Sequence, residues 1–540
     1  MTHRTANKAI ALYLFFTAVM GLIICYLFIV TVVHRDFFTS LAQRQQCMQI
    51  TSHPPRGAIY DRHGALLATN IASVSAFLVP TSIKQKKKLQ TFLQQHFPQA
   101  AKRLASGNYK KFMYIKRRLT ADEQAIITQA AIEDIHLIDE PCRFYPFEAL
   151  STVLGMTDID NKGLFGLELM HNQQLAGKPT IQTITKDARS DKWHVAQETI
   201  ERGSQPVPLY TTLDAQLQFI VQQELAATAI QYQARQLSAL IMDPTTGDII
   251  VMANYPAINP NNTQQFIAAD ANNRIVTQTF ELGSVMKTFA ALAAIAEGVV
   301  TQEELIDCQD KEAGVVDGMI VHTVPQSVAG CIPFWQVLQK SNNIGIATVA
   351  QRVGKKLYDH YRALGFGKKT GLDYLGEQAG HVTHPSTWSK RSLISLSFGY
   401  ELRATILQLA RAFATMANNG YLITPRLTTT TTIKKDGPLY TPTVITTMQE
   451  LLTLSGAKAA LAGYTIMGKT GTANMLIDGV YNKSINLYTF AGIVMHGNYK
   501  RVIVTFVNQI KQQGLLASTI ALPLFTAIAS RMVIHDGIIA

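Results

Sequence analysis

The longest apolar run of the chain lies close to its N-terminus. From Ala9 to Val33 there is no charged residue, and Leu, Ile, Val, Phe and Ala dominate. A helix of about 20 residues crosses a bilayer, whereas a secretory signal is shorter and ends at a small-residue cleavage site, which residues 29–34 do not offer. Arg4 and Lys8 precede the run and favour an N-terminus inside the cell. We therefore expect a cytoplasmic tail at 1–8, a transmembrane anchor at 9–33 and an extracytoplasmic remainder.

After the anchor, residues 35–205 mix strand-like and helical patterns. Ser73 to Val79 alternates apolar and polar side chains, which predicts a strand. The polar segment Lys84–Gln99 predicts a helix with a solvated face. This region is expected to form a mixed α/β domain of its own.

Two predicted β-hairpins frame the chain from about Pro206 onward. The first joins apolar strands at Leu237–Met242 and Ile249–Ala253 through a polar turn. The second joins Leu487–Met495 to Arg501–Val507, and a helix is predicted after it, at Ser518–Met532.

The segment between these hairpins is predicted to be largely helical. Apolar residues recur at helical spacing in four stretches: Val285–Glu297, Phe334–Gln339, Ile344–Gln351 and Thr405–Met416. Strands from both ends that enclose helices predict an α+β domain at 206–540, with one antiparallel sheet and an inserted helical subdomain.

The composition adds a basic surface but no nucleic-acid motif. The formal net charge is +12 and the pI about 9.3, which suits an anionic membrane surface or a cell-wall polymer. The basic runs at Lys84–Lys88 and Lys116–Arg118 lack interleaved aromatics, so we interpret them as solvated surface and expect no nucleic-acid partner.

The five cysteines form no metal-binding pattern. Cys308 and Cys331 are close enough in sequence to pair across one loop if this region is in an oxidising compartment. Free thiols are the alternative, and the sequence leaves both open.

The first chemical motif is Ser284-Val285-Met286-Lys287, at the start of an Ala-rich predicted helix. A helix places residues i and i+3 on one face, so the Lys287 amine can reach the Ser284 hydroxyl. Serine is a weak nucleophile without a base, and lysine is a base only when burial or another cation disfavours its charged form. By itself, the pattern is also that of an ordinary helix cap followed by a surface lysine.

The second motif is Ser341-Asn342-Asn343, after the predicted helix Phe334–Gln339. A capping or turn cluster is its simplest reading. In a catalytic reading, the Ser341 hydroxyl relays a proton and the Asn343 amide holds a peptide carbonyl.

The third motif is Lys469-Thr470-Gly471-Thr472, on a predicted strand. Gly471 would let a substrate backbone approach the strand edge closely. Lys469 contributes a cation, and the two threonine hydroxyls can bind a carboxylate.

In this order, the three motifs resemble the signature of serine β-lactamases and penicillin-binding proteins. The similarity extends to the class B penicillin-binding proteins, on two further stretches: Arg56-Gly57 with Asp61-Arg62 and Gly64, and Arg143 to Pro146 followed by Gly155 to Glu168. The Thr157–Gly163 stretch and the lead-in Glu281-Leu282-Gly283 most resemble the septal, division-specific branch of that family. Leu282 and Asn342 depart from the commoner proline and serine, with little expected effect.

The resemblance implies a role for each motif residue. Ser284 would be the nucleophile towards a D-Ala-D-Ala donor peptide, Lys287 its base, and Ser341 with Lys469 the proton path to the leaving amine. The resemblance implies four substrate-binding residues: Asn343, Thr470, Gly471 and Thr472. It implies no metal or organic cofactor.

The resemblance also implies the location of the chain and its binding partners. A non-catalytic pedestal or dimerisation-type domain at 35–205 would carry a transpeptidase domain at 206–540 outside the inner membrane. The expected partners are stem peptides on lipid-linked or nascent glycan, β-lactams, and a membrane glycan polymerase and division proteins bound through the anchor and pedestal.

Other classes fit the sequence less well. A class A β-lactamase would need a Glu-x-x-Leu-Asn element, and a bifunctional class A protein would need glycosyltransferase glutamates before residue 205; neither pattern is present. An elongation-specific sister transpeptidase and a catalytically silent β-lactam-binding scaffold stay open as alternatives.

Overall fold

The computed structural model describes residues 2–52, 54–108, 112–186, 193–262, 267, 270–477, 480–512 and 514–538. These residues form two compact units. The first comprises 1–55 with 176–206, and the second comprises 56–175 with 207–540.

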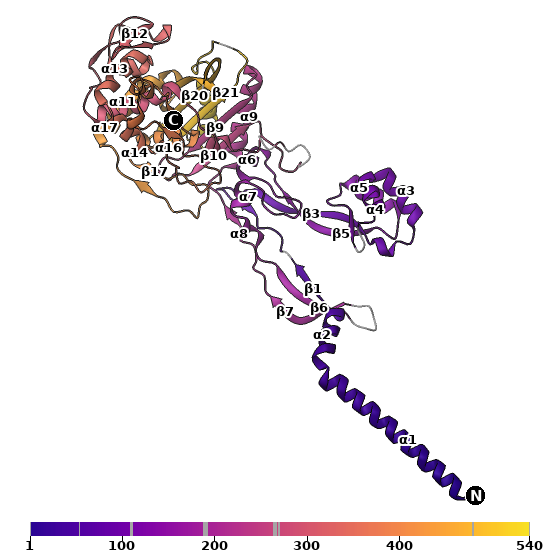
Figure 1. Cartoon of the computed structure of the whole chain (residues 1–540). Coiled ribbons are helices and arrows are strands. Elements are labelled where there is room, and N and C mark those ends of the chain that lie inside the picture. Colours follow the sequence, from indigo (N-terminus) through magenta and orange to yellow (C-terminus); the bar gives the residue numbers. More distant parts are fainter. Residues whose placement is uncertain are drawn as a thin grey trace. The chain divides into compact units, whose positions relative to one another are not determined.

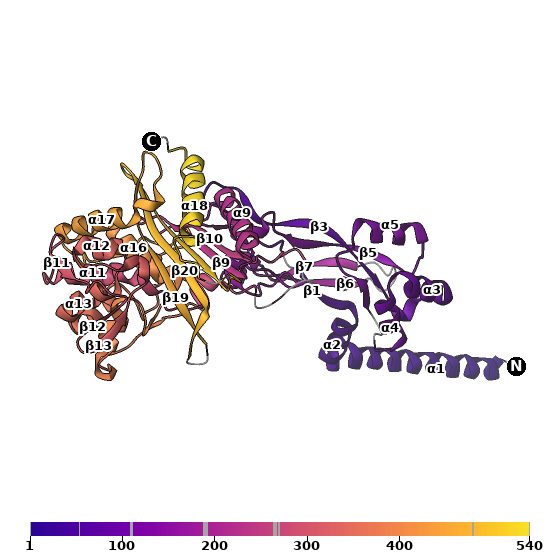
Figure 2. The ribbon, with the colours of Figure 1, turned by 90° about the horizontal axis from the view of Figure 1, so that it is seen from above.

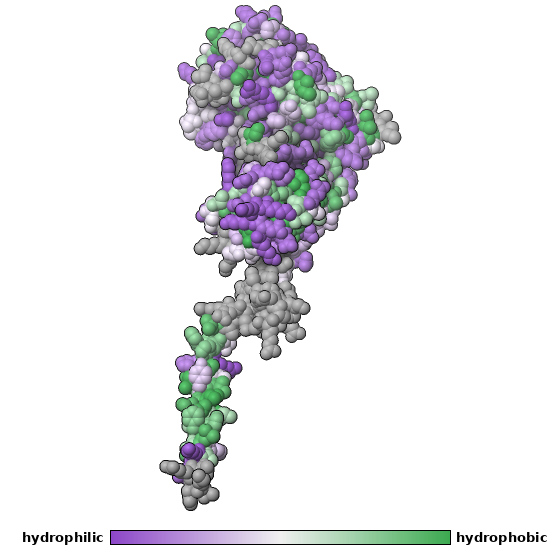
Figure 3. Space-filling model, turned by 90° about the vertical axis from the view of Figure 1, so that its right-hand side faces the viewer, coloured by the Kyte–Doolittle hydropathy of each residue, from purple (hydrophilic) through white to green (hydrophobic). Residues whose placement is uncertain are grey.

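The first unit begins with a long apolar helix, α1 (Thr2–Phe28), which continues as a π-helical turn at Ile29–Val33. Ala6–Val33 is the only stretch among the described residues that is long and apolar enough to span a membrane. Its large side chains are exposed, and Figure 3 shows them as an apolar surface. The predicted apolar helix is therefore confirmed, with π-helical geometry at its C-terminal end.

The rest of the first unit is a helix and a small sheet. Helix α2 (Arg35–Gln46) leads into β1 (Cys47–Ser52), which pairs with β6 (Thr180–Lys186). Strand β7 (Trp193–Glu201) completes the antiparallel order β1-β6-β7 (Figure 1).

The second unit begins with a mixed α/β region built on β3 (Leu66–Leu78). This strand contains the predicted Ser73–Val79 segment except for its last residue, Val79. It pairs with three neighbours: β2 (Ile59–Tyr60), β4 (Met113–Lys116) and β5 (His136–Phe144). Strand β8 (Leu209–Tyr210) pairs with β2. Eight helices and 3-10 turns accompany them among the described residues: η2 (Pro80–Ser82), α3 (Lys86–His96), α4 (Pro98–Ala105), α5 (Ala121–Ala130), η3 (Glu148–Leu150), α6 (Ser151–Leu154), α7 (Gly166–Met170) and α8 (Asn172–Ala176).

The predicted helix Lys84–Gln99 is wrong in its extent. The helix breaks at Phe97, because Pro98 disfavours helical geometry in the residue before it and instead starts α4. Leu89 and Leu93 of α3 are fully buried, so this helix has an apolar face as well as a solvated one.

Three charged residues of this region form a buried ion-pair cluster. Arg56 Nε lies 2.5 Å from Glu168 Oε2, and Arg143 Nε lies 2.7 Å from Glu168 Oε1. All three side chains are at most 2% exposed. The cluster joins the start of this region to its end, which gives a structural reason for the Arg56, Arg143 and Glu168 positions of the family-like stretches.

A five-stranded antiparallel sheet forms the centre of the remaining chain, in the order β10-β9-β21-β20-β19. It consists of the two predicted hairpins and one further strand: β9 (Gln236–Met242), β10 (Ile249–Tyr255), β19 (Thr465–Ile477), β20 (Val480–His496) and β21 (Tyr499–Asn508). Strand β19 lies at the sheet edge, so one row of its backbone groups has no partner strand among the described residues.

Helices cover both faces of this sheet (Figure 2). Along β21, Val502 and Val504 belong to one buried core, and Ile503 and Val507 belong to the other. This alternation follows from the two-residue period of a strand. Helices α9 (Ala215–Tyr232) and α18 (Ala521–His535) pack on one face of the sheet, and the helical subdomain packs on the other. The predicted α+β fold is therefore confirmed.

The helical subdomain lies on the other face and contains the four predicted helices. It includes α10 (Arg274–Thr277), α11 (Lys287–Ala296), α12 (Phe334–Gln339), α13 (Asn343–Val353), α14 (Lys356–Ala363), α15 (Ser392–Ser397), α16 (Ile406–Ala417) and α17 (Pro442–Gly456). Its small hairpins are β11 (Leu305–Asp307) with β14 (Cys331–Pro333), and β12 (Ala313–Val316) with β13 (Met319–His322).

Cys308 and Cys331 are free thiols in the structure. Cys331 pairs with Asp307 across β11 and β14 and is exposed, whereas Cys308 is fully buried. Of the two alternatives, the structure has the free thiols.

Candidate active site

Ser284 lies in a 3-10 turn, Gly283–Met286, that leads into α11. Gly283 has a φ of +61°, and a Cβ there would lie 2.5 Å from the Thr472 carbonyl oxygen. A Cβ on Gly471 would lie 2.6 Å from the Leu282 carbonyl oxygen. Glycine at both positions therefore lets the serine turn pack directly against the backbone of β19.

Lys287 follows one turn later and is 1% exposed. Its Nζ donates to the Ser341 carbonyl oxygen at 2.5 Å and to Ser341 Oγ at 3.1 Å. No hydrogen bond between Lys287 and Ser284 occurs in the described part of the chain. Burial, and next the charge of Lys469, hold the pKa of Lys287 well below its usual value.

Ser341 connects α12 to α13 in a left-handed conformation, with a φ of +59°. Asn342 is fully buried and caps α13: its Oδ1 accepts from Gly345 N at 2.8 Å, and its Nδ2 donates to the Ser327 carbonyl oxygen at 2.7 Å. The middle residue of the motif therefore holds the loop in place. Asn343 donates from Nδ2 to the His322 carbonyl oxygen at 2.6 Å.

Lys469 is the second buried lysine of the site, also 1% exposed. Its Nζ donates to the Thr470 carbonyl oxygen at 3.2 Å, and burial lowers its pKa to about 7. Neither Lys469 nor Lys287 makes an ion pair among the described residues. The site thus brings two buried lysines together, and neither has a carboxylate partner in the part of the chain that the structure describes.

The motif hydroxyls and the amide converge on one cleft of about 670 Å³. Five predicted residues line it: Ser284, Ser341, Asn343, Thr470 and Thr472. The other three predicted residues, Lys287, Lys469 and Gly471, are not among its lining residues. The structure therefore brings residues of all three motifs to the same cleft. The lysines of the first and third motifs are buried.

Sequence reasoning missed an aromatic side of this cleft. Phe398, Tyr400 and Asn474 also line it, and the Tyr400 hydroxyl accepts from Asn474 N at 3.5 Å. A Cβ on Gly399 would lie 2.2 Å from the Gly283 carbonyl oxygen, so this segment packs on the serine turn. The Phe398-Gly399-Tyr400 sequence was the available signal.

Comparisons with known proteins identify the family of the chain. The penicillin-binding protein transpeptidase domain matches residues 237–529, and the penicillin-binding protein dimerisation domain matches residues 51–207. The chain is 29% identical to the peptidoglycan D,D-transpeptidase FtsI of Escherichia coli over 497 residues, which cover 88% of this chain and 82% of that protein. It is 28% identical to the stage V sporulation protein D of Bacillus subtilis over 546 residues, covering 96% and 84%.

A solved structure shows the same fold. Penicillin-binding protein 3 of Mycobacterium tuberculosis, complexed with aztreonam, aligns with a TM-score of 0.68 at 24% identity, covering 91% of this chain and 98% of that one. The exposed N-terminal helix and the relatives agree in indicating a membrane-anchored protein. The transpeptidase match spans more than half of the chain, and the chain therefore belongs to the class B penicillin-binding proteins: it is a peptidoglycan D,D-transpeptidase that binds cell-wall peptides and β-lactams.

Proposed function

We propose that the chain cross-links stem peptides through an ester on Ser284. Ser284 Oγ loses its proton and attacks the carbonyl carbon of the penultimate D-alanine, and the bond to the terminal D-alanine breaks. An amine of a neighbouring stem peptide then attacks the ester, loses a proton, and returns Ser284 to its hydroxyl form. The convergence of Ser284, Lys287 and Ser341 in and beside one cleft supports this mechanism.

Lys287 is the base for the first step. Its lowered pKa favours the neutral amine that can accept the serine proton. In a 3-10 turn residues i and i+3 lie on one face, so Ser284 and Lys287 share a face although their side chains are not bonded in the structure. The Lys287 contact with Ser341 Oγ provides a path for the proton towards the leaving amine, with Lys469 nearby.

The remaining motif residues bind the donor. Thr470 and Thr472 hold its carboxylate, next to the Lys469 cation, and Asn343 holds its backbone. The backbone N–H groups of Ser284 and Thr472 form the oxyanion hole, where each such donor typically contributes about 3 kcal/mol. The close packing of the serine turn on β19 keeps these two amides on neighbouring backbones.

The observation that carries this proposal is that the buried Lys287 amine donates to Ser341, which lines the same cleft as Ser284. The test is to incubate the full chain in detergent with a fluorescent penicillin and map the adduct by mass spectrometry. We expect a stable adduct on Ser284 that is absent in Ser284→Ala and Lys287→Ala. Lys390→Ala removes an exposed lysine and is the matched control.

The outcomes separate the alternatives. Rapid loss of the label by hydrolysis would indicate a lactamase. A folded protein that takes no label would exclude the acyl-enzyme and favour the silent scaffold.

We also propose that the enzyme acts in septal wall synthesis. The Thr157–Gly163 and Glu281–Gly283 stretches and the similarity to FtsI support this role. Depletion in the source bacterium should produce filaments, whereas round cells would indicate the elongation-specific alternative.

For the anchor, we propose a cytoplasmic N-terminus in the inner membrane and contact with a glycan polymerase through residues 9–33 and 35–205. Arg4 and Lys8 before the apolar run support this orientation. Replacing Ala9–Val33 with an unrelated membrane-spanning helix should impair complementation. Full complementation would count against the polymerase contact.

A further inference from the structure

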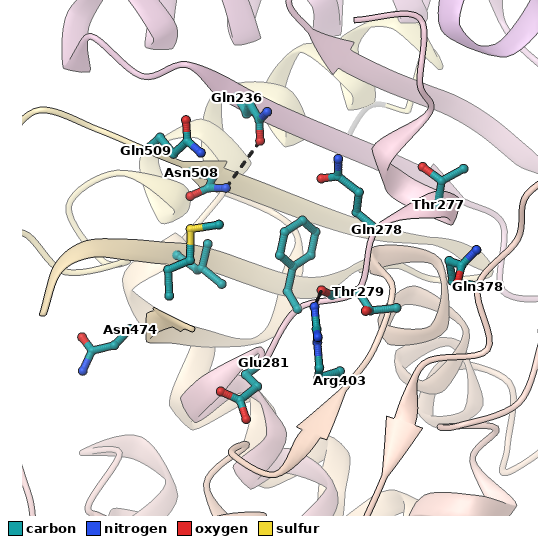
Figure 4. A pocket seen from close by; sticks show the side chains of 13 residues that line it. Gln236, Thr277, Gln278, Thr279, Glu281, Gln378, Arg403, Asn474, Asn508 and Gln509 are labelled. Atoms are coloured by element: carbon teal, nitrogen blue, oxygen red, sulfur yellow. Dashed lines mark hydrogen bonds between the residues drawn. The ribbon is translucent and has the colours of Figure 1, made fainter. Parts of the chain in front are cut away.

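A second cavity lies beside the catalytic cleft. It has a volume of about 450 Å³ and forms where the segment Thr277–Glu281 meets the ends of β9 and β21 (Figure 4). Asn474 of β19 lines both this cavity and the catalytic cleft. Glu281 lines the cavity and lies only three residues before Ser284.

The lining of this cavity is unusually rich in side-chain amides. Only Phe280, Met475 and Leu487 are apolar. The amides come from distant parts of the chain: Gln236, Gln278, Gln378, Asn474, Asn508 and Gln509. We call this cavity the amide pocket. Its lining suits a ligand that makes many hydrogen bonds rather than an apolar one.

Two buried oxygen atoms of the amide pocket lack a partner. Glu281 Oε1 accepts from Glu401 N at 2.9 Å and from the Tyr481 hydroxyl at 3.1 Å, but Glu281 Oε2 has no partner among the described residues. Asn508 donates to Gln236 Oε1 at 3.4 Å, and its Oδ1 is likewise without a partner there. Glu281 is 7% exposed and Asn508 is 1% exposed. Buried acceptors of this kind are costly unless a ligand donates to them.

The amide pocket also contains a cation. Arg403 is exposed, and its Nη2 donates to the Thr279 carbonyl oxygen at 3.1 Å (Figure 4). Its charge acts on the Glu281 carboxyl and lowers the pKa of that group, although burial raises it more. A carboxylate and a guanidinium in one polar cavity match a ligand that carries both an ammonium and a carboxylate.

The direction of the donor peptide leads to the same place. In the proposed binding mode its terminal carboxylate lies at Thr470 and Thr472, and the scissile carbonyl lies at Ser284. The residues before the scissile bond then run along the open edge of β19 towards Asn474, and so towards the amide pocket.

We propose that the amide pocket binds the side chain of the stem-peptide residue that precedes D-Ala-D-Ala, when that side chain ends in a free α-amino acid group. Glu281 accepts from its ammonium, and Arg403 binds its carboxylate. This inference rests on the proposed function, because it requires the donor to lie along β19.

The test compares three donor peptides that end in the same D-alanyl thioester. Their third residues are diaminopimelate, which has an ammonium and a carboxylate, lysine, which has the ammonium alone, and norleucine, which has neither. Thiol release by the full chain in detergent gives kcat/KM for each peptide. We expect kcat/KM to fall roughly tenfold or more from diaminopimelate to lysine, and again from lysine to norleucine, as charge-assisted hydrogen bonds are lost.

Two variants test which side chain causes each of these two decreases in kcat/KM. Arg403→Gln should abolish the difference between diaminopimelate and lysine, and Glu281→Gln should abolish the difference between lysine and norleucine. Each ratio is internal to one variant, so a smaller folded fraction cancels. Arg391→Gln removes an exposed guanidinium that does not line the pocket and should keep both ratios.

Different experimental outcomes would overturn this inference and the proposed function. Equal rates for the three peptides, or ratios that persist in both pocket variants, would overturn the amide pocket while the acyl-enzyme stands. No thiol release together with no penicillin adduct on Ser284 would overturn the proposed function itself.

Discussion

Two regions of the second unit bury full-length charged side chains, and the surroundings of those charges differ. In the ion-pair cluster, Glu168 lies between Arg56 and Arg143, with both guanidinium groups within 2.7 Å of its carboxylate. In the catalytic region, Lys287 and Lys469 are equally buried, but among the described residues their hydrogen-bond partners are hydroxyl and carbonyl oxygens of Ser341 and Thr470.

The difference explains which region is structural and which is chemical. A buried cation with a carboxylate partner stays charged and fixes two segments of chain together. Burial lowers the pKa of both lysines, and the charge of Lys469 lowers that of Lys287 further. The pKa of Lys469 is about 7, so this amine can exchange a proton near neutral pH.

The largest expected effect is on catalysis. Lys287→Met keeps the length of the side chain but removes the base, so penicillin acylation of Ser284 should fall by roughly 10²–10⁴-fold, the usual contribution of general base catalysis. The free energy of unfolding should not fall, because no buried charge loses a partner. Stopped-flow acylation and urea unfolding of the same sample measure both. If Lys287→Met lost stability in proportion to its loss of activity, the conclusion that this lysine serves catalysis rather than folding would be wrong.

In the ion-pair cluster, a substitution should reduce the stability of the fold. Glu168→Gln leaves two buried guanidinium groups without a counter-charge and should lower the free energy of unfolding by roughly 3–5 kcal/mol. Asp160→Asn is the control: Asp160 pairs with Arg117 at 2.6 Å but is 72% exposed, so its loss should cost less than about 1 kcal/mol. Equal losses in the two variants would show that burial of the pair has no special importance.

The lowered pKa of Lys469 should make the free energy of unfolding depend on pH. Its folded pKa is about 7, against 10.5 for an ordinary lysine. Between these values the unfolded chain binds more protons, so this residue makes the free energy of unfolding rise as pH increases from about 7 towards 10.5. Urea titrations across this range should show a smaller rise in Lys469→Met, and an unaltered rise in Lys390→Met. A rise that Lys469→Met leaves intact would have another origin.

The smallest expected effect concerns the loop that holds Ser341. Asn342→Ala removes the cap of α13 and should lower the free energy of unfolding by about 1 kcal/mol. The loop position that Lys287 contacts would loosen as well, so acylation should slow more than this loss of stability alone explains. Asn342→Asp can still cap the helix but places a buried carboxylate oxygen against the Ser327 carbonyl oxygen, so it should not restore the stability.

Much of this architecture could be predicted from local sequence patterns. The hairpins at 237–253 and 487–507, the four central helices and the three motifs have strong short-range signals, and the structure contains all of these elements. The roles of the motif residues and the domain borders at 35–205 and 206–540 stay predictions.

The parts that sequence could not predict depend on tertiary contacts. Periodicity did not show that Lys287 would bond to Ser341, because the two residues are 54 positions apart. The Arg56–Glu168 pair is separated by 112 positions. The amide pocket likewise combines Gln236 with Asn508, which become neighbours only when β9 pairs with β21.

The backbone contact between the serine turn and β19 also restricts how this enzyme can evolve under β-lactam selection. A side chain at Gly283, Gly399 or Gly471 would collide with backbone atoms of the opposing segment, so resistance substitutions at these positions would inactivate the enzyme along with its drug binding. Resistance should instead accumulate at the cleft lining around Phe398, Tyr400 and Asn474, where a side chain can change without moving the serine turn.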